Sequence, residues 1–125
     1  MKTYHNILLI TLFLGIVFTL SGCGKKKADK YGQEISNLTA TKVEAILTEP
    51  ENFDGKTVMV QGKIIRECPT GCWFEVKENA AIIYIDLNPS GFAIPQKVAK
   101  TAIVEGRVLV RNNQPMIVGT GVEIK

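Results

Sequence analysis

The chain has 125 residues, and its 15 Lys and Arg against 12 Asp and Glu give a formal net charge of +3. The basic excess lies near the N-terminus, because residues 35–125 hold equal numbers of cationic and acidic side chains. Nucleic-acid binders ordinarily present a basic face to phosphate, so this balance argues against nucleic acid as a partner. About a hundred residues beyond the N-terminal segment suit one small domain.

Residues 1–22 have the layout of an export signal. Lys2 lies in a short polar start, an apolar run covers residues 7–20, and two small residues precede Cys23. The apolar run is shorter than the roughly 20 residues that a membrane-spanning helix needs. The sequence "LSGC" resembles the lipobox of bacterial lipoproteins, which implies cleavage before Cys23 and acyl chains on Cys23. The alternative is an uncleaved N-terminal anchor.

Three regions follow from this interpretation. We expect a lipoprotein signal peptide at 1–22, a lipidated Cys23 with a flexible Lys-rich tether at 23–34, and a folded domain at 35–125. Two or three acyl chains anchor a protein stably, where one would not. The expected location is the cell envelope, lipid-anchored to a membrane, facing the periplasm or lying on the outer face of a single-membrane bacterium.

The folded domain opens with a helix and continues with strands. Thr41 and Glu44 have the spacing of a capping box, and Pro50 ends the predicted helix. Five segments alternate apolar and polar residues with strand period, and a short helix is predicted at 94–100, between strands three and four. The five predicted strands cover 56–68, 73–78, 80–87, 101–111 and 115–124.

This order of elements predicts an all-β fold with minor α content. A five-stranded Greek-key barrel of the OB type fits the order and the number of strands, and Gly62 and Gly106 are expected to bend two of them. An open meander or a small SH3-like barrel is the alternative. Asn112-Asn113 predicts a tight hairpin turn between the last two strands.

Several motifs also resemble a known family. The stretches "YGQEI", "ENFDGKTVMVQGKI", "CPTGCWFEV", "GFAIP" and "TAIVEGRV" occur in this order. Together they are similar to a family of small exported bacterial proteins catalogued as domain of unknown function 4920. The resemblance covers most of residues 31–110 and implies an OB-like fold and an exported location. It implies no known reaction.

Cys68 and Cys72 stand in a tight turn, with three residues between them. The only histidine is His5, in the export signal, so the mature protein offers no histidine for thioether-linked haem or zinc. Two thiols do not complete a metal site, and no metal or cofactor is expected. An oxidising compartment favours a structural Cys68–Cys72 disulfide. A redox-active dithiol is the sharper alternative, although such pairs usually have two intervening residues and lie at a helix N-terminus.

Alternation places Trp73 and Tyr84 on the outside of neighbouring strands, which is the usual ligand face of OB domains. Lys63 and Arg107 are the expected polar neighbours, and together the four residues form the predicted ligand-binding face. The alternative is that both rings only pack over one end of the barrel. Met116 is predicted to point into the core.

We therefore expect a membrane-tethered, exported binding module for a protein, a peptide or a small envelope ligand. It is expected to be a monomer and not an enzyme, because no motif supplies catalytic groups. The first alternative is a thiol redox or metal-handling protein that uses Cys68 and Cys72. A weaker alternative is nucleic-acid binding by analogy of fold alone.

Overall fold

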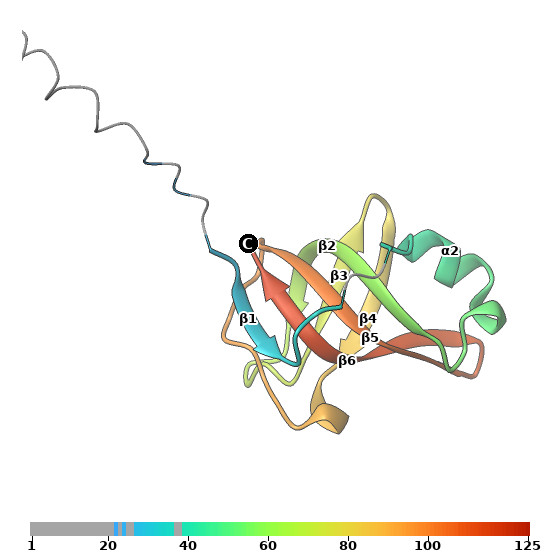
Figure 1. Ribbon diagram of the computed structural model, residues 1–125. Coiled ribbons are helices and arrows are strands. Elements are labelled where there is room, and N and C mark those ends of the chain that lie inside the picture. Colours follow the sequence, from blue (N-terminus) through green and yellow to red (C-terminus); the bar gives the residue numbers. More distant parts are fainter. Residues whose placement is uncertain (1–21, 23, 25–26, 37–38) are drawn as a thin grey trace, which may run out of the picture.

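A computed structural model describes residues 22, 24, 27–36 and 39–125 (Figure 1). The predicted export signal, except Gly22, and the predicted lipidation site Cys23 lie outside the described residues. Within the described part of the chain, no helix is long and apolar enough to cross a membrane.

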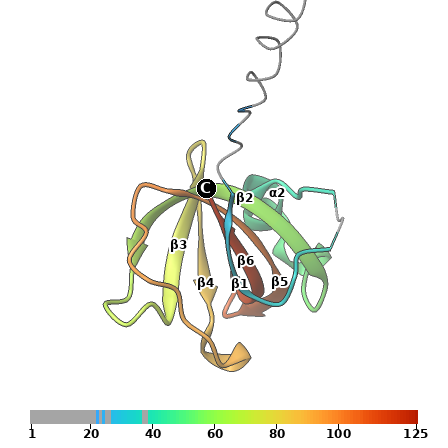
Figure 2. The ribbon, with the colours of Figure 1, turned by 60° about the vertical axis from the view of Figure 1, so that its left-hand side comes forward.

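Five strands form a closed barrel (Figures 1 and 2). They are β2 (Thr57–Glu67), β3 (Trp73–Glu78), β4 (Ala81–Asp86), β5 (Thr101–Arg111) and β6 (Gln114–Ile124). β2 pairs with β3, β3 with β4, β4 with β6, β6 with β5, and β5 again with β2. Only the β4–β6 pair is parallel. This closure confirms the OB-like barrel and excludes the open meander.

The barrel core follows from strict alternation along the strands. Phe74 and Val76 of β3 point inward beside Ile83 and Ile85 of β4, and all four are at most 1% exposed. Each such side chain contributes roughly 1.5–3 kcal/mol through burial. The predicted inward sets of β3 and β4 are therefore confirmed. The outward positions between them are left to form a surface.

Helix α2 (Val43–Thr48) is followed by the 3₁₀ turn η1 (Pro50–Asn52). The predicted capping box is wrong, because no side chain of the helix's own first turn caps it. The Thr41 amide instead donates to the Met59 carbonyl at 2.7 Å, which draws Thr41 toward β2. Glu78 replaces the box from the β3–β4 hairpin, where one carboxylate oxygen accepts the Val43 amide proton at 2.7 Å.

The helical turn between β4 and β5 lies earlier than predicted. It is the 3₁₀ turn η2 (Asn88–Ser90), whereas residues 92–97 are not helical. The Ile94 amide donates to the Gly71 carbonyl at 3.1 Å, and the Gln96 side chain donates to the Cys68 carbonyl at 2.9 Å. These contacts hold the segment extended against the cysteine turn, so it cannot coil into the predicted helix.

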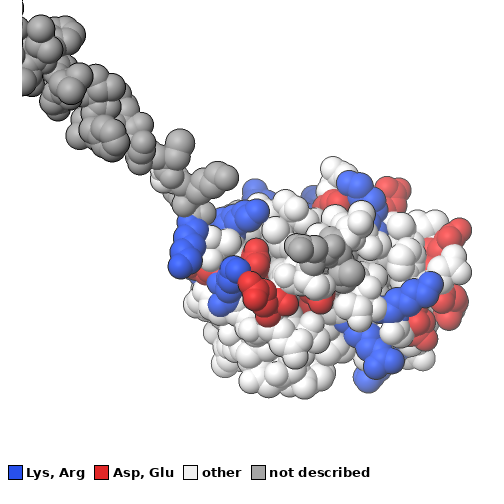
Figure 3. All heavy atoms as spheres, in the orientation of Figure 1, with Lys and Arg blue, Asp and Glu red and all other residues white. Residues whose placement is uncertain are grey.

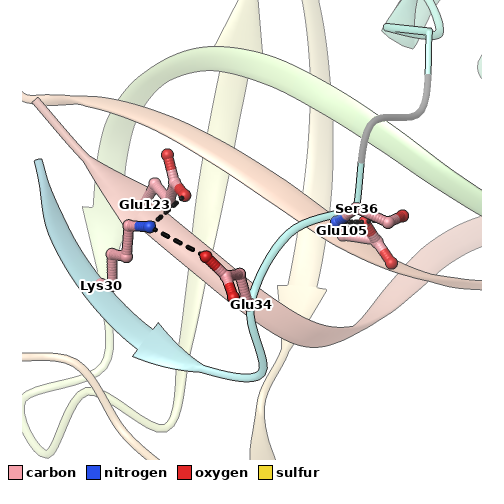
Figure 4. A network of polar contacts seen from close by, with 5 residues as sticks. All are labelled: Lys30, Glu34, Ser36, Glu105 and Glu123. Carbon is pink, nitrogen blue, oxygen red and sulfur yellow. Dashed lines mark hydrogen bonds and ion pairs between the residues drawn. The ribbon is translucent and has the colours of Figure 1, made fainter.

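A sixth strand precedes the helix. β1 (Asp29–Gly32) pairs antiparallel with the end of β6, so these four residues of the predicted flexible tether 23–34 form a strand. Lys30 Nζ lies 3.3 Å from Glu34 Oε1 and 3.6 Å from Glu123 Oε1 (Figure 4). The Ser36 amide and hydroxyl both donate to Glu105 at 2.8 Å. These contacts fix β1 and the chain after it to β5 and β6.

The barrel has two distinct ends. The root of the N-terminal segment, the C-terminus and the β3–β4 hairpin gather at one end (Figure 2). The cysteine turn and η2 lie at the other. Asn112 and Asn113 have φ values of 51° and 60°, as a two-residue hairpin turn of type I′ requires, which confirms the predicted turn.

Candidate functional site

An aromatic pair lies on the outer face of β3 and β4. The Trp73 and Tyr84 rings stack with their centroids 5.4 Å apart and their planes 29° apart. Trp73 is opposite Asp86, and Tyr84 is opposite Glu75, so the two rings meet on a diagonal between neighbouring strands. Both side chains are only partly buried. The predicted outward direction of both rings is confirmed.

Arg66 extends this pair onto a third strand. Its guanidinium carbon lies 5.6 Å from the Trp73 ring centroid, within range of a cation–π contact. Arg66 Nη2 also contacts Glu75 Oε1 at 2.7 Å. Arg66, Trp73 and Tyr84 therefore form a continuous row across β2, β3 and β4, which we call the aromatic row.

The two basic residues predicted beside the aromatic pair lie elsewhere. Lys63 is opposite Lys77, near the end of β3 that is far from Trp73. Arg107 is on β5, where its side chain donates to the Gly55 carbonyl at 3.1 Å. The structure thus brings together Trp73 and Tyr84 but neither Lys63 nor Arg107.

Sequence reasoning missed Arg66 because β2 contains a bulge. Strict alternation from Ile64 would turn Arg66 inward with it. The pairing of β2 with β3 shifts register between Ile64 and Arg66, so one extra residue is inserted and Arg66 emerges beside Glu75 on the outer face. No glycine or proline marks this bulge. The register shift of the β5–β6 pair, by contrast, adjoins the predicted Gly106, although its extra residue, Thr120, is on β6.

A shallow hollow of about 240 Å³ adjoins the aromatic row at Tyr84. Met116 and Pro115 supply apolar surface, while Asn112 and Gln114 supply amides and Arg111 supplies a charge. Met116 lies opposite Tyr84 in the parallel β4–β6 pair and is only partly buried. The predicted inward direction of Met116 is therefore wrong, and Ile117 takes the core position instead.

The Tyr84 hydroxyl lies in a partly desolvated and acidic environment. Burial is the main cause that raises the pKa of Tyr84 above its ordinary value of about 10. The neighbouring Asp86 carboxylate raises this pKa further, and the two cysteine sulfurs and Glu75 add to the effect. The phenol therefore stays protonated at neutral pH and can donate a hydrogen bond to a ligand.

The cysteine turn lies directly beside Trp73. The two cysteines are not bonded to each other in this structure, and the Cys72 thiol donates to Cys68 Sγ across 2.7 Å. Cys68 Sγ also lies 3.1 Å from the Thr70 hydroxyl. The Cys72 thiol and, after it, the Thr70 hydroxyl lower the pKa of Cys68 from 9.0 to about 6, because both contacts favour its thiolate. Cys68 is nevertheless only 9% exposed, and Cys72 is the more accessible of the two.

Backbone contacts hold the turn rigidly. The Cys68 amide donates to the Trp73 carbonyl at 2.9 Å, and the Leu87 amide donates to the Cys72 carbonyl at 3.0 Å. The hydrogen bond between Cys68 and Trp73 couples the position of Trp73 directly to the geometry of the turn. Nearby, Glu67 Oε1 accepts the Lys97 amide proton at 2.6 Å, whereas its buried Oε2 has no hydrogen-bond partner among the described residues.

A metal site is not assembled from the described residues. In this part of the chain, no three His, Cys, Asp or Glu side chains are grouped as potential ligands. Met116 lies on the outer face opposite Tyr84, and Met59 lies opposite Glu105 on the β2–β5 pair. The thioethers of these two methionines, which could act as soft ligands, therefore do not join the cysteines through strand pairing.

Comparison with known proteins bears on the fold alone. No protein-family model matches the chain, and no curated protein matches it. The structure is similar to that of the hypothetical protein ygiW from E. coli, with a TM-score of 0.56 and 17% sequence identity. The match covers 76% of this chain and 99% of that chain. It supports a small OB-like protein.

Proposed function

We propose that this chain is an exported, membrane-tethered binding module that takes its ligand on the aromatic row and the adjoining hollow. The ligand is a protein segment, a peptide or a small envelope molecule. The observation that carries the proposal is the partly exposed Trp73–Tyr84 stack on the outer face of β3 and β4. Aromatic rings beside polar groups dominate binding energy at many interfaces. On an OB-like barrel this is also the customary ligand face.

A ligand can displace the Arg66 side chain with little loss of free energy. Its side chain is 66% exposed, and an exposed ion pair such as the one with Glu75 contributes about 1 kcal/mol at most. A ligand that displaces the guanidinium gains the Trp73 ring surface. The hollow beside Tyr84 then accommodates a neighbouring apolar group, while the amides of Asn112 and Gln114 offer hydrogen bonds.

Trp73 is the only tryptophan of the chain, so its fluorescence reports on the site without a label. Envelope fractions and purified envelope ligands should be screened for a change in emission and for protection of Trp73 from iodide quenching. For a ligand that binds here, Tyr84→Ala should reduce the binding free energy by about 2 kcal/mol. A ligand that binds the Tyr84→Ala variant as it binds the parent, and leaves Trp73 open to iodide, would show that the aromatic row is packing alone.

The membrane tether rests on the sequence before the barrel. The proposal includes removal of residues 1–22, acylation of Cys23 and membership of the family of domain of unknown function 4920, on the motifs "CPTGCWFEV" and "GFAIP". The Cys23→Ser variant should lose the lipid mass and leave the membrane fraction. Equal mass shifts and equal membrane retention of variant and parent would contradict the lipid anchor.

A second candidate function, thiol–disulfide exchange, is favoured by the contact between Cys68 and Cys72. In this scheme the Cys68 thiolate attacks a substrate disulfide and expels one substrate thiolate. Cys72, losing its proton to solvent, then attacks Cys68 Sγ, releases the second substrate thiolate and leaves a Cys68–Cys72 disulfide. The substrate is reduced and the cysteine pair is oxidised.

Accessibility favours a structural role for the pair instead. The sulfur with the lowered pKa, Cys68, is the buried one, and a nucleophile needs an exposed sulfur. We propose that the pair is joined in the exported protein as a structural disulfide with a reduction potential below about −250 mV. A potential near −180 to −120 mV, together with turnover in a thiol-exchange assay, would favour the exchange function.

A further inference from the structure

A second hollow lies at the end of the barrel from which the N-terminal segment emerges. It has a volume of about 410 Å³ and lies between the start of α2 and the outer surfaces of β2 and β3. Three lysines line it, Lys42, Lys63 and Lys77, together with a single carboxylate, Glu78. Gly62 lets β2 approach β3 closely at this wall, because a Cβ there would overlap the Val76 side chain and the Lys77 carbonyl.

The charges in this hollow are not balanced. Both Glu78 oxygens are engaged, one with Lys42 Nζ at 3.3 Å and the other with the Val43 amide at 2.7 Å. All 12 Asp and Glu belong to the described residues, and none of them forms an ion pair with Lys63 or Lys77. These two lysines are directly opposite each other on β2 and β3. Two like charges in such a cross-strand pair repel each other, and a bound anion between them would relieve the repulsion.

Strand pairing links this hollow to the root of the tether. Lys63 is opposite Thr101, whose carbonyl accepts the amide proton of the C-terminal Lys125 at 2.9 Å. Lys100 precedes Thr101, and Asp29, the first residue of β1, is opposite Ile124. Figure 3 shows lysine and arginine side chains, with some acidic side chains among them, near the point where the N-terminal segment meets the barrel. Strand pairing therefore places Lys63, Lys77 and Lys125 on neighbouring strands with Lys100 beside them, and we call these four residues the basic end.

We propose that the basic end binds the phosphate groups of anionic lipids in the membrane that holds the tether, with Lys63 and Lys77 as the central contacts. The inference rests on the membrane tether of the proposed function. Charge complementarity supports it, because a lysine near an anionic bilayer is attracted to that surface. The short distance along the chain to Cys23 also supports it, because it keeps the basic end close to the bilayer. The aromatic row then lies away from the membrane.

The test measures lysine acylation on the complete lipoprotein, reconstituted in vesicles of phosphatidylcholine alone or with phosphatidylglycerol as the anionic lipid. A water-soluble amine-reactive ester labels exposed lysines, and mass spectrometry gives the rate at each. Anionic vesicles should slow the labelling of Lys63 and Lys77 at least about fivefold. Lys56, the residue before β2, serves as the internal control and should keep its rate.

Matched variants complete the test. Lys63→Gln with Lys77→Gln should return the labelling rates of Lys100 and Lys125 on anionic vesicles to those on neutral vesicles, whereas Lys56→Gln should leave both slow. Equal rates on the two vesicles, or equal slowing at Lys56, would overturn the proposal. So would slowing by inorganic phosphate on neutral vesicles, which would instead assign a free-anion site. The lipid mass on Cys23 is read separately, so failure of the anchor is distinguishable from failure of the docking.

Discussion

Gly71 shows how closely the cysteine turn is packed against the segment after η2. Its φ is +73°, and a Cβ at this position would overlap the Ile94 carbonyl oxygen. Ile94 is only 3% exposed, so its packing opposes a shift of this carbonyl away from the turn. Gly91 has nearly the same φ, +74°, but open space around its Cα. Alanine substitutions at the two positions therefore distinguish the cost of backbone strain, present at both, from the cost of steric overlap, present only at Gly71.

We expect Gly71→Ala to lower the free energy of unfolding by about 3 kcal/mol or more, because strain and overlap add. Gly91→Ala should cost only about 1–2 kcal/mol, the penalty of a left-handed conformation. Urea unfolding followed by circular dichroism measures both. Equal losses for the two variants would show that the turn can move away from Ile94.

The reduced cysteine pair has a testable acidity. Alkylation of Cys68 by iodoacetamide in the reduced protein should follow a pKa of about 6, because the Cys72 thiol and then the Thr70 hydroxyl stabilise its thiolate. Cys72→Ala should raise this pKa most and Thr70→Val should raise it less. Since the folded pKa is depressed, the thiolate adds to the stability of the reduced protein above the unfolded pKa, and this contribution is lost as pH falls through about 6. An alkylation midpoint near 9 in the parent would contradict the two contacts.

At the scale of elements, helix α2 depends on a residue outside it. Glu78, whose side chain is 20% exposed, accepts the Val43 amide proton and pairs with Lys42 from the β3–β4 hairpin. A carboxylate at a helix N-terminus both satisfies a free amide and complements the helix dipole. Packing of the helix against β4 is thereby joined to its capping.

We expect Glu78→Ala to lower the free energy of unfolding by about 1–2 kcal/mol. Glu44→Ala, which removes the carboxylate expected from the sequence to cap the helix, should change it by no more than about 0.5 kcal/mol. Thermal melting of both variants provides the comparison. A larger loss for Glu44→Ala than for Glu78→Ala would restore the capping box.

Elements with a regular alternation of apolar and polar residues were predictable, whereas elements that depend on contacts with distant parts of the chain were not. Alternation assigned the inward faces of β3 and β4 correctly because burial of Phe74 and Ile83 dominates local preferences. The bulge of β2 and the extended segment at 92–97 depend on partners far along the chain, β3 and the cysteine turn. Local sequence carries no record of these partners. Arg66 was missed and Lys63 was misplaced for the same reason.

For the whole molecule, barrel closure was predictable from the order and number of strands. Strand β1 was not, since "DKYG" is polar and forms a strand only through its pairing with β6. The Trp73–Tyr84 half of the candidate site followed from alternation. The proposal that the protein is a binding module rests on the partly exposed aromatic rings of this surface.

Global stability should distinguish the aromatic row from the core. Phe74→Ala should lower the free energy of unfolding by about 3–5 kcal/mol, because Phe74 is fully buried inside the barrel. Trp73→Ala, the adjacent position on the outer face, should cost clearly less, since its ring is partly exposed. Chemical denaturation of both variants measures the difference. If Trp73→Ala were as damaging as Phe74→Ala, the ring would be structural material.

The pairing of β1 with β6 also sets how far the barrel can travel. Because β1 begins at Asp29, only residues 23–28 remain between the proposed anchor and the fold. Six extended residues reach about 20 Å, less than the roughly 36 Å of the 11-residue strand β6. With the proposed anchor in place, the barrel would be confined within a thin layer above the bilayer, at a high effective concentration toward membrane-bound partners. Under the proposed function, a partner free in the compartment would have to diffuse to this layer, whereas a partner anchored in the same membrane would meet the aromatic row by two-dimensional search.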